Sequence, residues 1–521
     1  MEIHQLDATD LLDKLNRREL TSVQIVTALY DRADKVDGKL NSLTIRYSQR
    51  ALDDARRADE ERAQGKSLGP LHGLPITIKE SVSTAGDEIS LGVEARKGRY
   101  AEEDAVVVRL LKEAGAIPIA KTNISQLMLF HESDNPVFGA TKNPWSLAHV
   151  PGGSSGGEAA AIAAGITPWG IGTDIGGSIR VPAAFTGTAG LKPTVDRWSN
   201  LGCVAALSGQ EVVRGQIGPM ARTARDVSLL FRAINSKAHA KYDPVVPPHD
   251  VGNPFEVDIR RLKIGYFSDD GFIRASSALT RVVENSAAMM EELGAKLVKI
   301  SPQHQSEIMD TYFGALSSDG GVSVRNHLAG GTVSDQLKPL SRIAGMPSSG
   351  RKVLSKVARF SRQPRVARLL EVVGEKAVFD YWQLTARRAE IKARVHREWR
   401  EHGIDAVICP AYATPAIRHG QSDDFSMAGS YSMRYNFLNF PGGVVPISRV
   451  EKTDAIRADI LQRLEKKAAN VEEHSLGLPL GVQVVGRPFE EDVVLAIMIA
   501  LEAKAKKEIG FPKTPVESIE L

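Results

Sequence analysis

The sequence predicts an α/β fold in which helices cover a largely buried β-sheet. Helical and strand-like patterns alternate along the first quarter of the chain, and strand-like runs recur near the C-terminal end. Alternation of this kind is typical of layered sheet-and-helix architectures. No stretch of linker composition separates the two groups of strands, so we expect one continuous sheet in a single domain spanning residues 1–521.

The N-terminal elements are marked by caps and periodicity. A Thr-Ser cap precedes residues 21–37, in which Ile25 and Leu29 share one face, and this predicts a helix. The apolar run 74–79, rich in β-branched residues, predicts a buried strand. Apolar positions at helical spacing predict a helix over residues 104–115, which ends at Gly115, and a strand follows at 117–120.

The later elements continue this alternation. An Ala-rich helix ends at Gly165, and an apolar strand runs through Ile171. We expect further strands at 262–267, 406–409 and 480–485 and a closing helix at 490–506. The Gly- and Ser-rich segment 317–350 predicts loops, whereas residues 351–400 predict a long, basic helical stretch.

Composition and charge exclude several classes of protein. The 521 residues are 42% hydrophobic and 25% charged, as in globular proteins and unlike disordered chains. The chain has 66 Lys+Arg and 63 Asp+Glu, a net charge of only +3. This is too small for a protein that binds nucleic acid through its overall charge, so we expect no nucleic-acid partner. Cys203 and Cys409 are too few for a disulfide framework, lack the spacing of a zinc site and favour a cytoplasmic location. Neither a signal peptide nor a membrane span is predicted, because the first ten residues have no apolar core and the longest apolar run covers only residues 493–501.

Glycine is concentrated where the chemistry is expected. Eleven of the 39 residues from 152 to 190 are glycine, against 45 of 521 in the whole chain. They fall in two motifs, Gly-Gly-Ser-Ser-Gly-Gly-Glu at 152–158 and Gly-Thr-Asp-Ile-Gly-Gly-Ser-Ile-Arg at 172–180. Successive glycines before a helix let backbone N–H groups converge on an anion, which is either a phosphate or the oxyanion of acyl transfer.

The oxyanion interpretation fits the motifs better. Neither glycine cluster has the Walker spacing with its Lys-Ser/Thr, and the dinucleotide fingerprint is absent. Acyl transfer instead requires a nucleophile beside N–H donors, which Ser178 supplies. The motifs do not identify the base that would activate Ser178. No histidine lies between Val150 and Asp226, but a histidine from a distant part of the chain is still possible as the base. Lys79 ends an apolar strand, where burial lowers a lysine pKa, although such a residue is more often a solvated strand end.

Three ordered motifs resemble the amidase signature hydrolases. They are residues 69–75 followed by Lys79, residues 151–158, and residues 172–182 with Gly-Leu-Lys-Pro at 190–193. Segments 122–129, 135–139 and 435–446 resemble the fatty-acid amide hydrolases within that family. The resemblance implies a mixed, twisted β-sheet core covered by α-helices on both faces. It further implies hydrolysis of N-acyl amines with a long apolar acyl chain, to a carboxylic acid and an amine, without metal or cofactor.

The resemblance also assigns roles by motif. Ser178 is the nucleophile, Ser154 the bridging serine after a cis peptide bond, and Lys79 the base. Neutral Lys79 would take a proton from Ser154, whose oxygen takes one from Ser178, and the reverse transfer would protonate the leaving amine. We expect the amides of residues 175–178 to hold the oxyanion. The remaining expected site residues are Ile175, Gly176, Gly177 and Met128 at the substrate carbonyl, and Ser155, Asp174 and Arg180 as loop braces.

Residues 351–373 are interpreted as a basic amphipathic cap within the domain. Apolar residues recur there at helical spacing, and Pro364 indicates a break into two short helices. Seven basic and no acidic residues lie between 351 and 370: Arg351, Lys352, Lys356, Arg359, Arg362, Arg365 and Arg368. By resemblance this cap lies on a bilayer, so we expect reversible, peripheral association with an anionic membrane surface. The alternative is a solvated basic face over an ordinary packed stripe.

Other functions stay open at this point. One is an amidase of the same family acting on short, aryl or peptide amides. Another is the amidase subunit of a transfer RNA amidotransferase, against which the motif around Asn135 and the segment 351–373 argue. A membrane-binding protein with an inactive hydrolase fold is disfavoured by the intact Lys79, Ser154 and Ser178. The sequence leaves open whether the chain forms a homodimer.

Overall fold

A computed structural model describes residues 2–458, 460 and 462–519. The strands in these residues form one eleven-stranded sheet in the order β1-β3-β2-β4-β6-β5-β10-β11-β9-β7-β8. They are β1 (Leu43–Arg46), β2 (Pro75–Lys79), β3 (Ile117–Thr122), β4 (Trp169–Asp174), β5 (Ala189–Lys192), β6 (Gln216–Ala221), β7 (Lys263–Tyr266), β8 (Lys296–Lys299), β9 (Ala406–Cys409), β10 (Gly442–Arg449) and β11 (Pro479–Gly486). The expectation of one continuous sheet holds for this described part of the chain.

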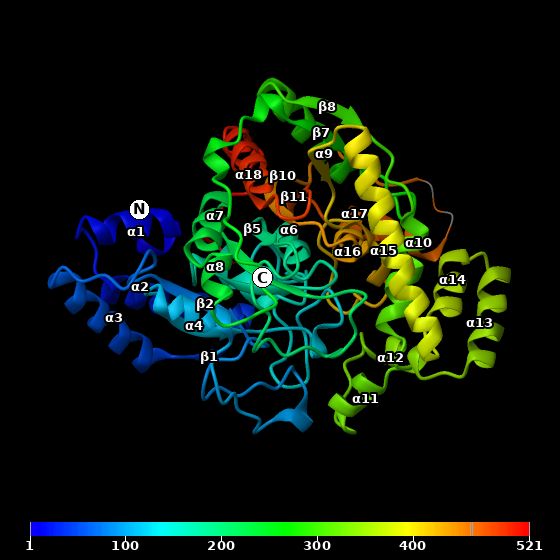
Figure 1. Cartoon of the computed structure of the whole chain (residues 1–521), viewed down its shortest axis with the longest axis horizontal. Coiled ribbons are helices and arrows are strands. Elements are labelled where there is room, and N and C mark those ends of the chain that lie inside the picture. The colour runs from blue at the N-terminus through cyan, green and yellow to red at the C-terminus, as the bar shows by residue number, and fades with distance from the viewer. Residues whose placement is uncertain (1, 459, 461, 520–521) are drawn as a thin grey trace.

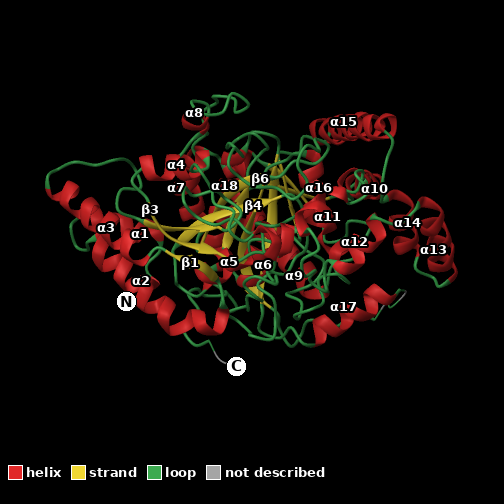
Figure 2. Ribbon diagram, turned by 90° about the horizontal axis from the view of Figure 1, so that it is seen from below, coloured by secondary structure: helices red, strands yellow, loops and turns green. Residues whose placement is uncertain are grey.

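The sheet is mixed, as expected. Strand β2 runs parallel to β3 and β4, and β7 runs parallel to β8 and β9. The other neighbouring pairs are antiparallel. The sheet occupies the middle of the molecule with helices on both sides (Figure 2), which confirms the predicted α/β class.

The helices fall into an N-terminal group, a central group and a C-terminal group. The first contains α1 (Ala8–Asn16), α2 (Ser22–Leu40), α3 (Ser48–Ala63), α4 (Val106–Glu113), α5 (Gly156–Ala163) and α6 (Arg180–Thr186). The second contains α7 (Ala224–Ala233), α8 (Ser236–His239), α9 (Ser277–Glu292), α10 (Gln305–Leu316), α11 (Val322–Leu328) and α12 (Lys338–Ala344). The third contains α13 (Ser348–Phe360), α14 (Pro364–Val372), α15 (Val378–Glu401), α16 (Ser430–Leu438), α17 (Arg463–Glu473) and α18 (Glu491–Ala505).

Locally encoded elements lie where the sequence predicts them. Thr21 caps α2 by accepting the Gln24 N–H over 3.1 Å, and the Gln24 side chain accepts the Thr21 N–H over 2.9 Å. Strands β2, β3, β4, β7, β9 and β11 and helices α4, α5 and α18 agree with the predicted ranges to within a few residues. Strands β1, β5, β6, β8 and β10 were not predicted. Of these, β5, β6 and β10 contain Gly or Pro, which are poor strand formers, so cross-strand pairing determines them.

The prediction of loops over residues 317–350 is wrong. This segment contains α11, α12 and the start of α13. Val324, Leu328 and Leu337 are buried against an apolar cluster that includes Leu91 and Leu127. Tertiary packing therefore stabilises helices that the Gly- and Ser-rich composition does not indicate.

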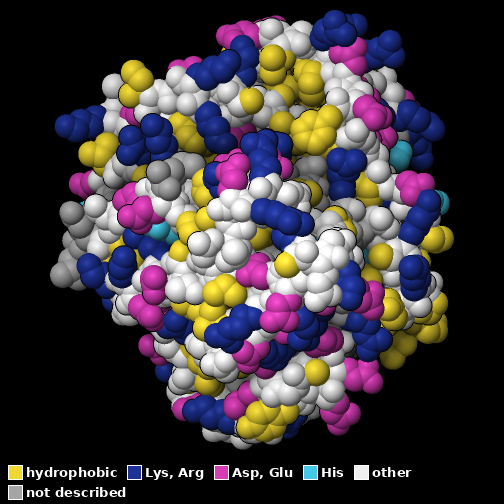
Figure 3. Space-filling view, turned by 90° about the vertical axis from the view of Figure 1, so that its left-hand side faces the viewer, with side chains coloured by type: hydrophobic (Ala, Val, Ile, Leu, Met, Phe, Trp, Pro, Cys, Tyr) yellow, Lys and Arg dark blue, Asp and Glu magenta, His cyan; other side chains and the backbone are white. Residues whose placement is uncertain are grey.

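The stretch 351–400 is helical as predicted and contains most of α13, all of α14 and most of α15. Pro364 occupies the first turn of α14, so the break that it predicts is present. Helices α13 and α14 lie at one edge of the molecule, opposite the N-terminal helices α1–α3 (Figures 1 and 2). Basic and acidic side chains are intermixed on the face opposite this edge (Figure 3). Within the described ranges, no helix has both the length and the apolarity needed to cross a membrane.

Candidate active site

The sheet brings Lys79 to the Gly-rich loops. Strands β2 and β4 are parallel neighbours, so Lys79 at the end of β2 and Thr173 near the end of β4 reach the same edge. The Lys79 Nζ lies 2.7 Å from Ser154 Oγ, 2.9 Å from Ser155 Oγ and 2.8 Å from Thr173 Oγ1. All three oxygens belong to hydroxyls, which can donate as well as accept. The amine can therefore be satisfied in its neutral form.

Burial controls the ionisation of Lys79. The side chain is fully buried, and this desolvation lowers its pKa to about 7, although the carboxylates of Asp174, Glu158 and Glu80 favour the charged form. Glu158 lies on α5 and is fully buried. Its two carboxyl oxygens accept the Thr77 hydroxyl and, over 2.8 Å, the Thr122 hydroxyl. Burial raises the pKa of Glu158 to about 8.

Ser178 lies in the turn between β4 and α6 and is almost completely buried. Its carbonyl accepts the Ser155 N–H over 3.2 Å, which joins the two Gly-rich loops. The peptide bond between Gly153 and Ser154 is cis, as the resemblance implies. Among the described residues, the Ser178 hydroxyl has no hydrogen-bond partner. The structure thus contains the Lys79–Ser154 contact of the expected relay but not a Ser154–Ser178 hydrogen bond.

A buried ion pair braces the loop that carries Ser178. Arg180 donates from Nε to Asp174 Oδ2 and from Nη2 to Asp174 Oδ1, each over 2.9 Å. The guanidinium holds the pKa of Asp174 well below its usual range, against the opposing effect of burial. Asp174 also accepts the Gly177 N–H over 2.8 Å and the Ile179 N–H over 3.1 Å. Asp174 and Arg180 therefore have the contacts expected of braces, and Ser155 contacts Lys79 directly.

The expected oxyanion amides are not equivalent. The Gly177 N–H already has Asp174 as its acceptor. In the part of the chain that the structure describes, the amides of Ile175, Gly176 and Ser178 have no acceptor. Three of the four amides are thus available to an anion, and the expectation for Gly177 needs correction because its N–H is used within the loop.

A mostly apolar cavity of about 410 Å³ meets the loops at Ser154 and Ser178. Met128, expected near the substrate carbonyl, lines it. The cavity continues toward α10, α12 and the end of α14, where its lining residues include Phe313, Leu316, Leu337, Leu340, Ala344, Leu369 and Val373. Its volume and lining suit an extended apolar group placed beside the two serines.

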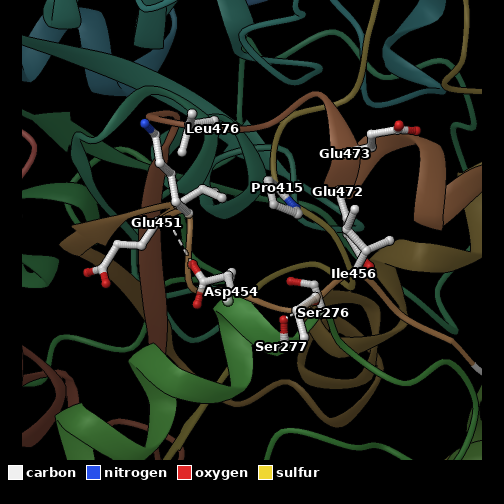
Figure 4. A pocket seen from close by; sticks show the side chains of 13 residues that line it. Ser276, Ser277, Pro415, Glu451, Asp454, Ile456, Glu472, Glu473 and Leu476 are labelled. Carbon is white, nitrogen blue, oxygen red and sulfur yellow. Dashed lines mark hydrogen bonds between the residues drawn. The ribbon is translucent and has the colours of Figure 1, made fainter.

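A second pocket, of about 190 Å³, lies elsewhere and is lined by Ser276, Ser277 and several acidic residues (Figure 4). Its polar groups serve local structure. Ser276 caps α9 by accepting the Leu279 N–H over 3.3 Å, and Asp454 pairs with Arg281. Lys79, Ser154 and Ser178 do not line this second pocket, so we do not assign the pocket to the reaction.

Comparisons with known proteins agree with this fold. The family model described as Amidase matches residues 24–495, so the chain belongs to the amidase signature family and is an amide hydrolase. Fatty-acid amide hydrolase 1 from Sus scrofa is 33% identical over 508 residues, which is 95% of this chain and 85% of that protein. A glutamyl-tRNA(Gln) amidotransferase subunit from Moorella thermoacetica is 30% identical over 96% of this chain and 97% of its own length. A solved structure of fatty acid amide hydrolase superposes with a TM-score of 0.83 at 26% identity, covering 96% of this chain and 85% of that one.

Sequence reasoning missed three residues that contact the site. Glu158 stands within the motif at 152–158, and its position there was the available signal. Tyr312 and His131 contact the loop after β4 from distant parts of the chain. No local pattern marks either residue as part of the site, because both contacts depend on tertiary structure.

Proposed function

We propose that this chain hydrolyses N-acyl amines with an apolar acyl chain, using Ser178 as nucleophile, Ser154 as bridge and Lys79 as base. One observation carries the proposal. A fully buried lysine with a pKa of about 7 lies 2.7 Å from Ser154 Oγ, and Ser154 and Ser178 both line the apolar cavity. A neutral amine in this place can accept a proton at physiological pH.

The steps follow from these positions. Lys79 takes the proton of Ser154, Ser154 takes that of Ser178, and Ser178 Oγ bonds to the amide carbonyl carbon. The amides of Ile175, Gly176 and Ser178 hold the oxyanion. The protons then return in reverse order to the leaving nitrogen as the C–N bond breaks, since an amine anion is a poor leaving group. Water, deprotonated by the same relay, releases the acid and restores Ser178.

The cavity supports the choice of substrate class. A small polar amide such as glutamine would leave most of the apolar lining between Leu316 and Val373 in contact with water, which is unfavourable. The 33% identity to a fatty-acid amide hydrolase points in the same direction. The 30% identity to an amidotransferase subunit keeps a glutamine amidase as the second candidate.

A hydrolysis screen over acyl lengths and amine groups tests this proposal. We expect long-chain amides to be turned over faster than short, aryl or peptide amides and faster than glutamine. Ala344, at the end of α12, lines the cavity. Ala344→Phe should lower the rate for long chains more than for short ones, because the ring takes space that the chain requires. A preference for glutamine, or equal losses at every length, would contradict the substrate class.

The nucleophile is tested separately with a fluorophosphonate probe. Wild type should be labelled, and Ser178→Ala should be neither labelled nor active. Ser277→Ala is the matched control, since Ser277 lines the other pocket and donates to the Ala455 carbonyl. Labelling that persists in Ser178→Ala with full activity would contradict the assignment.

We also propose that α13 and α14 dock on an anionic membrane surface, through a smaller face than the sequence predicts. Val353, Val357 and Phe360 are exposed, and Phe360 is 92% exposed. In contrast, Leu370 and Val373 are buried, and Leu369 and Val373 line the cavity. The C-terminal part of the expected apolar stripe therefore faces the protein interior. The interfacial face is therefore limited mainly to α13.

The positive charge available to lipid is also smaller than the composition indicates. Arg359, Arg365 and Arg368 pair with Glu371, Glu465 and Asp310, respectively. Arg351 is buried and donates to the Met346 carbonyl. Within the described residues, this leaves Lys352, Lys356 and Arg362 without an acidic partner. Three free cations beside an exposed apolar row favour weak, salt-sensitive binding.

A further inference from the structure

The peptide groups of the loop after β4 are held from their carbonyl sides. The Asp174 carbonyl accepts Asn436 Nδ2 over 3.2 Å, and the Ile175 carbonyl accepts the Tyr312 hydroxyl over 3.0 Å. The Gly176 carbonyl lies 3.0 Å from His131 Nε2, which must be the donor because a carbonyl oxygen only accepts. The Gly177 carbonyl accepts the Val181 N–H over 2.7 Å.

Each of these contacts orients an N–H group. In a trans peptide, the carbonyl and the N–H that follows it point in opposite directions. Tyr312 therefore turns the Gly176 N–H away from α10, and the start of α6 does the same for the Ser178 N–H. The peptide group between Gly176 and Gly177 is held at both ends, by His131 and by Asp174.

Gly176 and Tyr312 fit one another closely. A Cβ atom on Gly176 would lie 2.6 Å from the Tyr312 hydroxyl oxygen, a separation that real side chains do not reach. Gly176 therefore provides the space that lets the tyrosine reach the loop. Tyr312 is itself buried, and its helix α10 also lines the cavity through Phe313 and Leu316.

We propose that Tyr312 is a positioning residue that aims the Gly176 amide at the reaction oxyanion, with His131 locking the adjacent peptide group. This inference rests on the proposed function, because it assumes an oxyanion formed at Ser178. Tyr312 also lines the cavity, but its single hydroxyl proton is donated to the Ile175 carbonyl, so it acts through the loop and not on the substrate carbonyl. Its hydroxyl fixes a donor before the reaction begins, which is how preorganised donors stabilise a developing charge.

Tyr312→Phe removes the hydroxyl and keeps the ring. Loss of one oxyanion donor costs about 100- to 1000-fold in kcat, so loss of its orientation alone should lower kcat about tenfold, with KM changed less than about twofold. A long-chain trifluoromethyl ketone, which forms a tetrahedral adduct with a serine, should bind about tenfold more weakly. The carboxylic acid of the same chain forms no tetrahedral adduct, so its affinity for the Tyr312→Phe variant should change less than that of the ketone.

Tyr30→Phe is the matched control. Tyr30 is also buried and donates its hydroxyl to a backbone carbonyl, that of Ile119, over 2.9 Å, but it lies on α2 and does not line the cavity. This variant should lose similar thermal stability and keep kcat and ketone affinity. If Tyr312→Phe leaves both values unchanged, or weakens acid and ketone binding equally, the positioning role is wrong.

Two further variants separate this result from other failures. Introduced alone, Gly176→Ala should lower kcat as Tyr312→Phe does. Added to Tyr312→Phe, it should cause little further loss, because without the hydroxyl the nearest atoms to the new Cβ would be 3.6 and 3.7 Å away. It also tests the proposal if Tyr312→Phe folds poorly. Ser178→Ala should abolish formation of the ketone adduct. Unchanged ketone affinity in Ser178→Ala would instead overturn the proposed function.

Discussion

Lys79 and Ser154 meet through a 2.7 Å contact although they are 75 residues apart. The contact requires β2 and β4 to lie side by side and the Gly-rich turn before α5 to approach their shared edge. Gly157 allows that approach, because a Cβ there would lie 2.3 Å from the Asn123 nitrogen and 2.5 Å from its carbonyl oxygen. The geometry of the site thus depends on close backbone packing as much as on the reactive side chains.

The first prediction concerns pH. Because burial lowers the pKa of Lys79 to about 7 and only the neutral amine accepts a proton, the rate of amide hydrolysis should rise as pH increases through 7 and then level off. The profile of kcat/KM, recorded where thermal unfolding shows an intact protein, measures this. A rate that is constant or falls across this range would remove the base role.

The second prediction separates acid from base chemistry. Lys79→Ala should reduce hydrolysis of an amide more than that of the matched ester, because only the amide strongly needs a proton on its leaving group. Lys121→Met is the control: Lys121 is equally buried, with its pKa lowered to about 8, but it donates to the Val82 carbonyl and not to a serine. The control should keep the wild-type ratio of amide to ester rates, and an unchanged ratio in Lys79→Ala would count against the assignment.

The third prediction concerns stability. Arg180→Met leaves the buried carboxylate of Asp174 without its cation, and removal of one partner of a buried pair costs about 3–5 kcal/mol of unfolding free energy. Arg359→Met breaks an exposed pair with Glu371 and should cost only about 0–1 kcal/mol. Denaturant unfolding of the two variants should show this difference. Similar losses would mean that the buried pair does not brace the loop.

The fourth prediction concerns the cap. Wild type should co-sediment with anionic liposomes at low salt, and less with neutral liposomes or at high salt. Changing Val353, Val357 and Phe360 to Ser, together with Lys352, Lys356 and Arg362 to Glu, should reduce binding without loss of soluble amidase activity. Phe255→Ser, which alters an exposed aromatic residue outside the cap, is the control. Equal partition of wild type and the cap variant would end the membrane proposal and leave the amidase proposal intact.

Much of the candidate site was predictable because its residues stand in continuous motifs. The glycines around Ser154 and Ser178 predicted a backbone that receives an anion, whereas the apolar run before Lys79 left a solvated strand end open and only the family resemblance indicated a base there. The same reasoning could not show that the Gly177 N–H donates to the Asp174 carboxylate, because that hydrogen bond depends on the conformation of the turn. Nor could it show that Leu370 and Val373 face inward while Phe360 faces outward, since helical spacing alone does not say which side meets the protein.

Local sequence specifies the α/β class, the caps and periods of the main helices, the strongly apolar strands and the motifs that carry Lys79, Ser154 and Ser178. These properties are encoded by the propensities and spacing of neighbouring residues. The strand order, the helices within 317–350, the cavity and the contact between Tyr312 and Ile175 are instead set by the folded chain as a whole. These features arise from residues far apart in the chain, and their stability comes from burial and pairing that exist only once the fold has formed.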